Sequence, residues 1–209
     1  MKRGHIWVSP WLIVLLLVFF AIDASVYAPL VVFSAALHEA GHLFALQRLG
    51  IRVEQIRFHP FGIEITAPGL FSLPYRGELC VAAAGPIANL LCACCTVALV
   101  FLFGDFTGAL FLVVCNLALA GLNLMPVDDL DGGRILSALL LQKLDLDRAE
   151  VVLESVSNLS LALILAAGLW LLYTTRYNFS LAMIGCYLLA RRVLKTSPSA
   201  GVFPGGKPC

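Results

Sequence analysis

Six apolar segments divide the chain, and each is close to the length of a helix that crosses a lipid bilayer. They cover residues 6–22, 27–49, 79–103, 106–125, 155–173 and 178–194. A spanning helix needs about 20 apolar residues, because the hydrocarbon core of a bilayer is about 30 Å thick. Hydrophobic residues make up 60% of the chain and charged residues 13%, with a mean hydropathy of +0.93, which is far too apolar for a soluble domain. We therefore predict an all-α polytopic membrane protein with about six transmembrane helices.

The charged residues indicate the orientation of the chain and exclude one class of partner. If the N-terminus is cytoplasmic, each of the 14 lysine and arginine residues except Arg176 lies on the cytoplasmic side. This asymmetry follows the positive-inside rule and predicts that both termini are cytoplasmic. The formal net charge is only +1, so no broad basic surface is available for a nucleic acid. The expected partners are the lipid bilayer and other membrane proteins.

The two ends of the chain need separate interpretation. Lys2 and Arg3 precede the first apolar segment, as in a signal peptide, but Asp23-Ala24-Ser25 leads directly into the second segment. This continuity favours a retained helix over a cleaved signal. Residues 196–209 are rich in proline and glycine, and we expect them to form a disordered tail.

Residues 51–66 predict a short β-hairpin associated with the membrane. Apolar and polar residues alternate along this segment, as they do in strands with one buried face. The alternation is interrupted at His59-Pro60-Phe61-Gly62, where we expect the turn. The segment is too short and too charged to span a bilayer, so we place it between the second and third apolar segments as a ribbon.

The second apolar segment carries His38-Glu39-Ala40-Gly41-His42, an H-E-x-x-H pattern. Histidines four residues apart lie one turn apart on one face of a helix, so both imidazoles can reach one metal ion. Glu39 follows the first histidine, where its carboxylate can take a proton from a metal-activated water. An ionisable residue inside a spanning helix costs about 2.5–3.5 kcal/mol on insertion scales, so three within five residues indicate function. A hydrogen-bonded polar cluster without metal is the alternative.

The two histidines need a third ligand, because a catalytic zinc commonly takes three from the protein and leaves one position open. The remaining histidines of the chain are His5 and His59. Better candidates follow the fourth apolar segment, where chemistry alone permits any of three aspartates. The pair Gly132-Gly133 favours Asp131, because glycines let the backbone turn tightly and approach closely. We expect Asp128 and Asp129 to lie in solvent or to cap the next helix, which begins at about residue 134.

Together these motifs resemble the site-2 protease family of intramembrane zinc metalloproteases. The segment 123–133, which begins with Asn123 and ends in Leu130-Asp131-Gly132-Gly133, is similar to the family's N-x-x-P-x-x-x-L-D-G-G pattern. Gly85-Pro86-Ile87-Ala88-Asn89 resembles its G-P-x-x-N, at the start of a core helix. The 51–66 ribbon and the six-helix layout resemble the compact bacterial group that includes stage IV sporulation protein FB. Asp128 and Asp129 stand where family members often have prolines.

The resemblance implies a site, a reaction and a location. One zinc ion would be held by His38, His42 and Asp131, with Glu39 as the general base. Asn123 would be the motif asparagine that engages the substrate backbone. The implied reaction is hydrolysis of a peptide bond in or near a transmembrane segment of a membrane-protein substrate, in the bacterial cytoplasmic membrane. Residues 5–195 would form a single integral-membrane metalloprotease domain, without a PDZ or CBS domain, followed by the 196–209 tail.

Other interpretations remain open at this point. Asn123 can form an interhelical hydrogen bond instead, the ribbon can be an interfacial lid, and Asn89 and Asn116 are expected to join helices. A non-proteolytic scaffold or chaperone would be expected to lack metal ligands, which are complete here. A metal transporter would carry polar residues across the membrane, yet the outer halves of these segments are almost wholly apolar.

Overall fold

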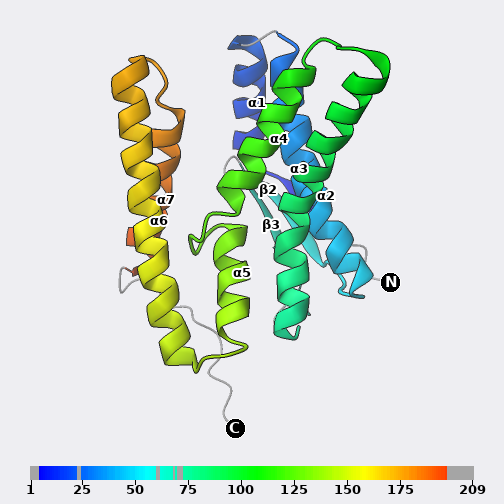
Figure 1. Cartoon of the computed structure of the whole chain (residues 1–209). Coiled ribbons are helices and arrows are strands. Elements are labelled where there is room, and N and C mark those ends of the chain that lie inside the picture. The colour runs from blue at the N-terminus through cyan, green and yellow to red at the C-terminus, as the bar shows by residue number, and fades with distance from the viewer. Residues whose placement is uncertain (1–4, 23–24, 60–61, 68, 70–72, 197–209) are drawn as a thin grey trace. The chain divides into compact units, whose positions relative to one another are not determined.

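The chain folds into helices and one small sheet, and the computed structural model describes residues 5–22, 25–59, 62–67, 69 and 73–196 (Figure 1). The elements in chain order are β1 (His5–Val8), α1 (Pro10–Ile22), α2 (Tyr27–Arg48), β2 (Gln55–His59), β3 (Gly62–Thr66), α3 (Tyr75–Phe103), α4 (Ala109–Asn123), α5 (Asp131–Leu140), α6 (Leu146–Thr175) and α7 (Ser180–Thr196). They divide into two compact units, and the boundary falls within α6, between Leu153 and Glu154. The predicted tail, apart from its first residue, lies outside the described residues.

The predicted β-hairpin is confirmed, and a third strand joins it. β2 and β3 pair antiparallel, with Gln55 opposite Thr66 and His59 opposite Gly62. β1 pairs with β2 in parallel, with His5 opposite Gln55, so the strand order is β1-β2-β3. The ribbon between α2 and α3 is therefore one part of a sheet that includes the beginning of the described chain.

The expected helix over residues 6–22 is wrong in its first turn. Residues 5–8 form β1, and α1 begins only at Pro10. Proline is favoured at the first helical position, where its missing N–H needs no partner and its backbone angle already suits a helix. The Ser9 carbonyl accepts the Leu12 N–H at 3.0 Å, which closes the first turn. The apolar run continues through this boundary, so hydropathy alone does not reveal it.

Three helices are long and apolar enough to cross a membrane: α2, α3 and α6. Helix α4 is apolar but has 15 residues, while α1 has 13 and α7 has 17. The prediction of a mostly helical membrane protein is thus confirmed. The prediction of six crossings is not decided by helix length and stays a prediction.

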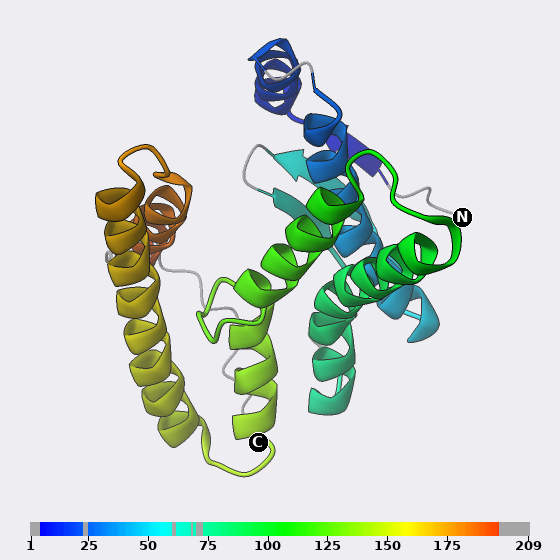
Figure 2. The same cartoon turned by 45° about the horizontal axis from the view of Figure 1, so that its top comes forward.

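In the first unit α2 packs against α3 and α4, and α3 also packs against α4 and α5 (Figures 1 and 2). Small residues allow the closest of these approaches. A Cβ added to Gly41 of α2 would lie 2.5 Å from the Ala84 carbonyl oxygen and 3.0 Å from the Ala88 Cβ, both on α3. Close contact between small residues is a common way for helices to associate in lipid. This crossing places α3 directly beside the H-E-x-x-H turn of α2.

In the second unit the main part of α6 packs against α7, again at a glycine. A Cβ added to Gly168 would lie 2.6 Å from the backbone nitrogen of Ala182. Arg192 of α7 also makes polar contacts with α6: its Nη1 donates to Ser157 Oγ at 2.6 Å, and its Nη2 lies 3.7 Å from Glu154 Oε1. Ser157 is fully buried, so this hydrogen bond satisfies a hydroxyl that lipid could not.

The Gly41 crossing can be tested by adding a single methyl group. We expect Gly41→Ala to lower the free energy of unfolding by about 1–3 kcal/mol, because the new Cβ collides with a backbone carbonyl that cannot move aside. The matched control is Gly121→Ala in α4, where nothing lies within 4 Å and where alanine favours the helix. Thermal unfolding of both variants in detergent measures the difference. Equal stability of the two variants would contradict the close crossing.

Candidate metal centre

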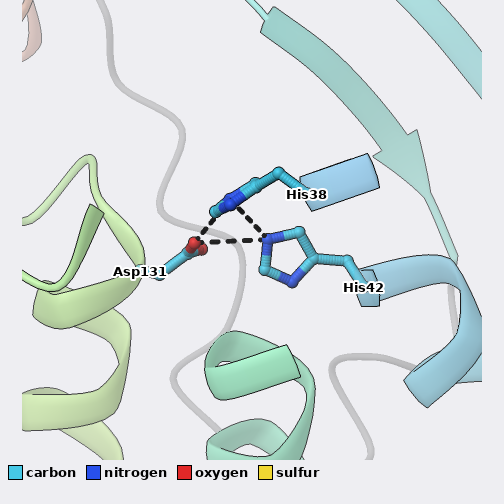
Figure 3. Close-up of side chains that lie close together, drawn as sticks. All are labelled: His38, His42 and Asp131. Atoms are coloured by element: carbon cyan, nitrogen blue, oxygen red, sulfur yellow. Dashed lines mark hydrogen bonds and ion pairs between the residues drawn. The ribbon is translucent and has the colours of Figure 1, made fainter. Parts of the chain in front are cut away.

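Helix α2 presents two buried imidazoles on one face, as the H-E-x-x-H spacing predicts. His38 and His42 are 6% and 8% exposed. Their Nε2 atoms lie 3.2 Å apart and point toward the same place (Figure 3). One helical turn therefore supplies two nitrogen ligands that converge rather than lie parallel.

Asp131 brings a carboxylate to these two nitrogens from a segment 93 residues beyond His38. Its Oδ2 lies 3.0 Å from His38 Nε2 and 3.2 Å from His42 Nε2 (Figure 3). Within the described part of the chain, these three side chains form the one group of histidine, cysteine and acidic residues placed to hold a metal ion, with all ligand atoms within 4.8 Å of one another. The structure thus brings together the three residues that the motifs indicate as metal ligands.

Two glycines place Asp131 at the beginning of α5. A Cβ on Gly132 would collide with the backbone carbonyls of Leu124 and Met125, and a Cβ on Gly133 with that of Val127. The first turn of α5 therefore packs directly onto the preceding loop, which supports the expectation of close backbone approach. Helix N-termini also favour negative charge, which suits an ionised carboxylate there.

The other two aspartates take no part in this group. The expectation that Asp128 and Asp129 lie in solvent or cap the helix is wrong, because both are half-buried and the residue at the cap position is Leu130. The helix begins at Asp131 rather than near residue 134. The Gly132-Gly133 pair enters the first turn because its backbone must pack against the loop, although glycine is a poor helix former.

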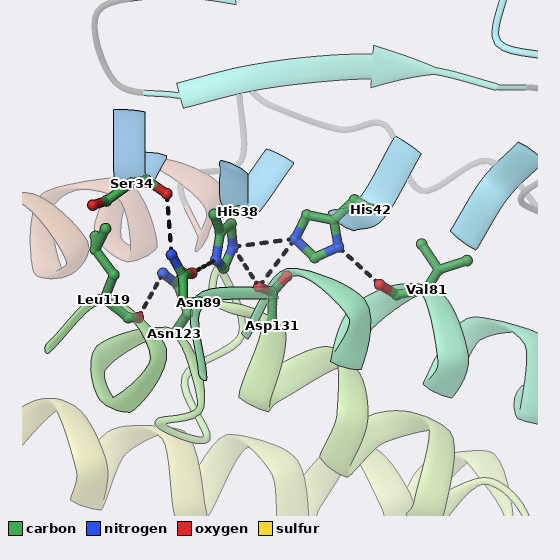
Figure 4. Close-up of polar contacts among 8 residues, drawn as sticks. All are labelled: Ser34, His38, His42, Val81, Asn89, Leu119, Asn123 and Asp131. Carbon is green, nitrogen blue, oxygen red and sulfur yellow. Dashed lines mark hydrogen bonds and ion pairs between the residues drawn. The ribbon is translucent and has the colours of Figure 1, made fainter. Parts of the chain in front are cut away.

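Two hydrogen-bond acceptors on α3 orient the two imidazoles. His42 Nδ1 lies 2.8 Å from the Val81 carbonyl oxygen, and His38 Nδ1 lies 2.6 Å from Asn89 Oδ1 (Figure 4). A carbonyl oxygen can only accept, so each Nδ1 donates and each Nε2 offers its lone pair. Hydrogen bonds of this kind to the second nitrogen commonly fix the tautomer of metal-binding histidines.

Gly85 leaves the space in which the ligand atoms meet. A Cβ added there would lie 2.7 Å from His38 Nε2 and closer still to His42 Nε2. Gly85 lies between Val81 and Asn89 on α3, one turn from each. The same helix therefore orients both imidazoles and leaves room for what they bind.

The donor set fits a zinc ion. Zinc–ligand bonds of about 2.0–2.1 Å in a tetrahedral site put neighbouring ligand atoms roughly 3.4 Å apart, close to the 3.0–3.2 Å seen here. Two imidazole lone pairs and a carboxylate at this spacing repel one another unless a cation lies between them.

Two predicted site residues, Glu39 and Asn123, are not part of the ligand group. Glu39 is half-buried and interacts electrostatically with the side chains of His38, His42 and Asp131. Asn123 is also half-buried, but its Nδ2 donates to the Leu119 carbonyl of its own helix at 2.9 Å.

Two residues of the site were not recognised from the sequence. The sequence predicts for Asn89 only that it joins helices, and it predicts no role for Gly85 alone. Both belong to the G-P-x-x-N motif, which was the available signal. Its meaning depends on α3 facing the two histidines, and a single sequence does not show which helices face each other.

Comparisons with known proteins agree with this geometry. No protein family model matches the chain. It is 31% identical over 137 residues to a zinc metalloprotease of Methanocaldococcus jannaschii, across 63% of this chain and 39% of the relative. It is 28% identical over 156 residues to stage IV sporulation protein FB of Bacillus subtilis, across 73% of this chain and 52% of that protein. The chain thus spans about half the length, or less, of these two relatives.

A solved structure extends the likeness to the whole fold. The site-2 protease from Methanocaldococcus jannaschii matches with a TM-score of 0.65 at 21% sequence identity, and the match covers 100% of this chain and 97% of that one. At this identity the match concerns the fold. The residue-level argument still depends on the ligand geometry.

We expect Gly85→Ala to abolish metal binding while leaving the chain folded. The added methyl group occupies the space between the two Nε2 atoms, and its clash is with the imidazoles rather than with a backbone. Metal content after purification, measured beside the unfolding temperature, separates loss of the site from loss of the fold. Gly121→Ala serves as the control. Full metal occupancy in Gly85→Ala would show that the ion lies elsewhere.

Proposed function

We propose that this chain is a member of the site-2 protease family, an intramembrane zinc metalloprotease that hydrolyses a peptide bond in or near a transmembrane segment of a membrane protein. One observation carries the proposal. The ligand atoms of His38, His42 and Asp131 converge at one place. The two histidines and Glu39 belong to α2, a helix long and apolar enough to cross a membrane. Burying such a group of ionisable residues in a membrane helix costs free energy, and hydrolysis inside lipid is a function that requires this group.

The three ligands would hold one zinc ion through two imidazole nitrogens and a carboxylate oxygen. Zinc bound there supplies a Lewis acid, which acidifies water and polarises a carbonyl group. Three protein ligands leave room for a fourth, which is the arrangement of catalytic rather than structural sites. Val81 and Asn89 hold the imidazoles, so the ligands need little reorganisation when they bind the ion.

Glu39 acts as the general base. It takes a proton from the attacking water and donates it to the departing amine when the peptide bond breaks. Its position supports this role, because it follows His38 in α2 and is half-buried within electrostatic range of all three ligands. Each imidazole uses Nδ1 toward α3 and Nε2 toward the ion, so Glu39 is the group beside the ligands that can exchange the proton.

A substrate helix must unwind locally, because its carbonyls are held in i→i−4 hydrogen bonds. We propose that Asn123 and the outer edge of β3 hold the unwound segment by hydrogen bonds to its backbone. β3 is an edge strand of the described sheet, which supports pairing with an added strand. The Asn123 amide makes one bond to Leu119, and an amide has a second N–H and a carbonyl oxygen to offer.

We further propose six crossings with both termini in the cytoplasm, within a single catalytic domain over residues 5–195. At about 1.5 Å per residue, α1, α4 and α7 are roughly 20–26 Å long, shorter than the bilayer core of about 30 Å. Helices of this length cross where the bilayer thins around the protein. A thinner bilayer would also bring cytoplasmic water nearer to Asp131, which lies beyond the end of α4.

Glu39→Gln tests the protease assignment. We expect the variant to bind zinc as the wild type does and to lose cleavage by a factor of about 100 or more, because glutamine cannot accept the proton. The assay is co-expression with a panel of tagged single-span membrane proteins, followed by detection of the shortened product. Glu150→Gln removes an exposed glutamate and should cleave normally. Equal cleavage by wild type and Glu39→Gln at equal zinc content would refute the assignment.

A second pair of variants tests the third ligand. We expect Asp131→Asn to lose most of its bound zinc, since a neutral amide replaces the only carboxylate in the ligand group. Asp128→Asn should retain zinc, because its side chain lies outside that group. Metal analysis of the two purified proteins makes the comparison. Loss of zinc from Asp128→Asn alone would move the assignment to Asp128.

A further inference from the structure

A row of buried polar side chains begins at His38 and runs away from the metal centre. His38 Nδ1 lies 2.6 Å from Asn89 Oδ1, and Asn89 Nδ2 lies 2.8 Å from Asn116 Oδ1. Asn116 Nδ2 in turn lies 2.9 Å from Ser34 Oγ. Asn89, Asn116 and Ser34 are all 0% exposed and come from α3, α4 and α2. Groups this deeply buried persist only when hydrogen bonded, so the orientation of each depends on its neighbours.

Backbone carbonyls determine which way both amides face. Asn116 Nδ2 donates to the Leu112 carbonyl at 2.9 Å, so its Oδ1 is turned toward Asn89. Asn89 Nδ2 donates to the Ser34 carbonyl at 3.0 Å as well as to Asn116. These acceptors cannot donate, so exchanging the oxygen and nitrogen of Asn89 would break both bonds. The oxygen of Asn89 therefore faces His38 (Figure 4).

This orientation selects one form of the His38 ring. Because Asn89 Oδ1 can only accept, His38 Nδ1 carries the hydrogen, and the lone pair of the neutral ring is on Nε2. That nitrogen lies 3.0 Å from Asp131 Oδ2 and 3.2 Å from His42 Nε2. The other tautomer would turn an N–H toward the place where a metal ion binds. His42 differs, since its acceptor is the Val81 backbone, which no side-chain substitution removes.

We propose that Asn89 is a positioning residue of the metal centre, which holds His38 in the metal-binding tautomer and orientation, and that Asn116 and Ser34 hold Asn89. The inference rests on the proposed zinc site and adds the residues that prepare it. The competing explanation is that the same amides only join α2, α3 and α4. The two explanations differ in what they predict for zinc affinity once the protein is folded.

The test compares zinc affinities of the full chain in detergent, measured by competition with a chromophoric chelator. Asn89→Leu removes the acceptor at similar volume and should weaken zinc binding by about 10–100-fold. Asn116→Leu removes one of the two acceptors that hold Asn89 but leaves the oxygen that faces His38, and it should weaken zinc binding by a smaller factor than Asn89→Leu. The control is Thr96→Val, which removes a buried hydroxyl of α3 whose bond stays within the helix, and it should leave the affinity unchanged.

Two further readouts separate positioning from packing. Replacing zinc with Co²⁺ gives a visible spectrum that reports ligand geometry, and we expect it to change in Asn89→Leu but not in Thr96→Val. ¹⁵N NMR of the zinc-loaded wild type should show His38 protonated at Nδ1, a measurement that does not depend on any variant folding.

Three results would overturn the inference. The first is a folded Asn89→Leu with wild-type zinc affinity and Co²⁺ spectrum. The second is a folded Asn116→Leu that loses more zinc affinity than Asn89→Leu. The third is a His38 protonated at Nε2 in the loaded protein. A wild-type chain that binds no zinc at all would overturn the proposed function itself, and this inference with it.

Discussion

Lipid offers no hydrogen-bond partner, and this constraint orders the interior of the first unit. Every polar side chain on the inner faces of its helices must find its partner in the protein. The chain meets this condition by placing its buried polar groups next to one another, from Ser34 through Asn89 and His38 to Asp131 and His42. The proposed metal ligands are one end of this row, so the stability of the helix bundle and the geometry of the site depend on the same bonds.

The site depends equally on three glycines, which leave space because they have no side chain. Gly41 lets α3 approach the H-E-x-x-H turn, Gly85 leaves room between the imidazoles, and Gly132 lets the first turn of α5 reach the loop before it. Each of these glycines faces a backbone or a ligand, where even a methyl group has no space. A larger residue at any of them would keep one element from approaching the others. The distances of 3.0–3.2 Å between ligand atoms result from these close approaches.

The sequence predicts the parts of the site that follow from local periodicity. Helical spacing places His38 and His42 on one face, and strand alternation locates the β2–β3 ribbon. Asp131 can be favoured as the third ligand from the sequence, because two glycines follow it and let the backbone turn tightly. The start of α1 was missed because residues 5–8 continue an apolar run, and their strand form depends on pairing with residues 55–58. The role of Asn89 was missed for the same reason, since its partner lies 51 residues away on another helix.

The parallel pairing of β1 with β2 also sets the order in which a growing chain can be assembled. His5 pairs with Gln55, and α1 and α2 lie between them in the chain. At a synthesis rate of about 5–20 residues per second, the first strand waits roughly 3–10 s for its partner to be made. The carboxylate of Asp131 is made later still, after α3 and α4. A nascent chain therefore enters the membrane without its complete set of candidate ligands, and the candidate metal centre forms only after the helices that enclose it have been translated.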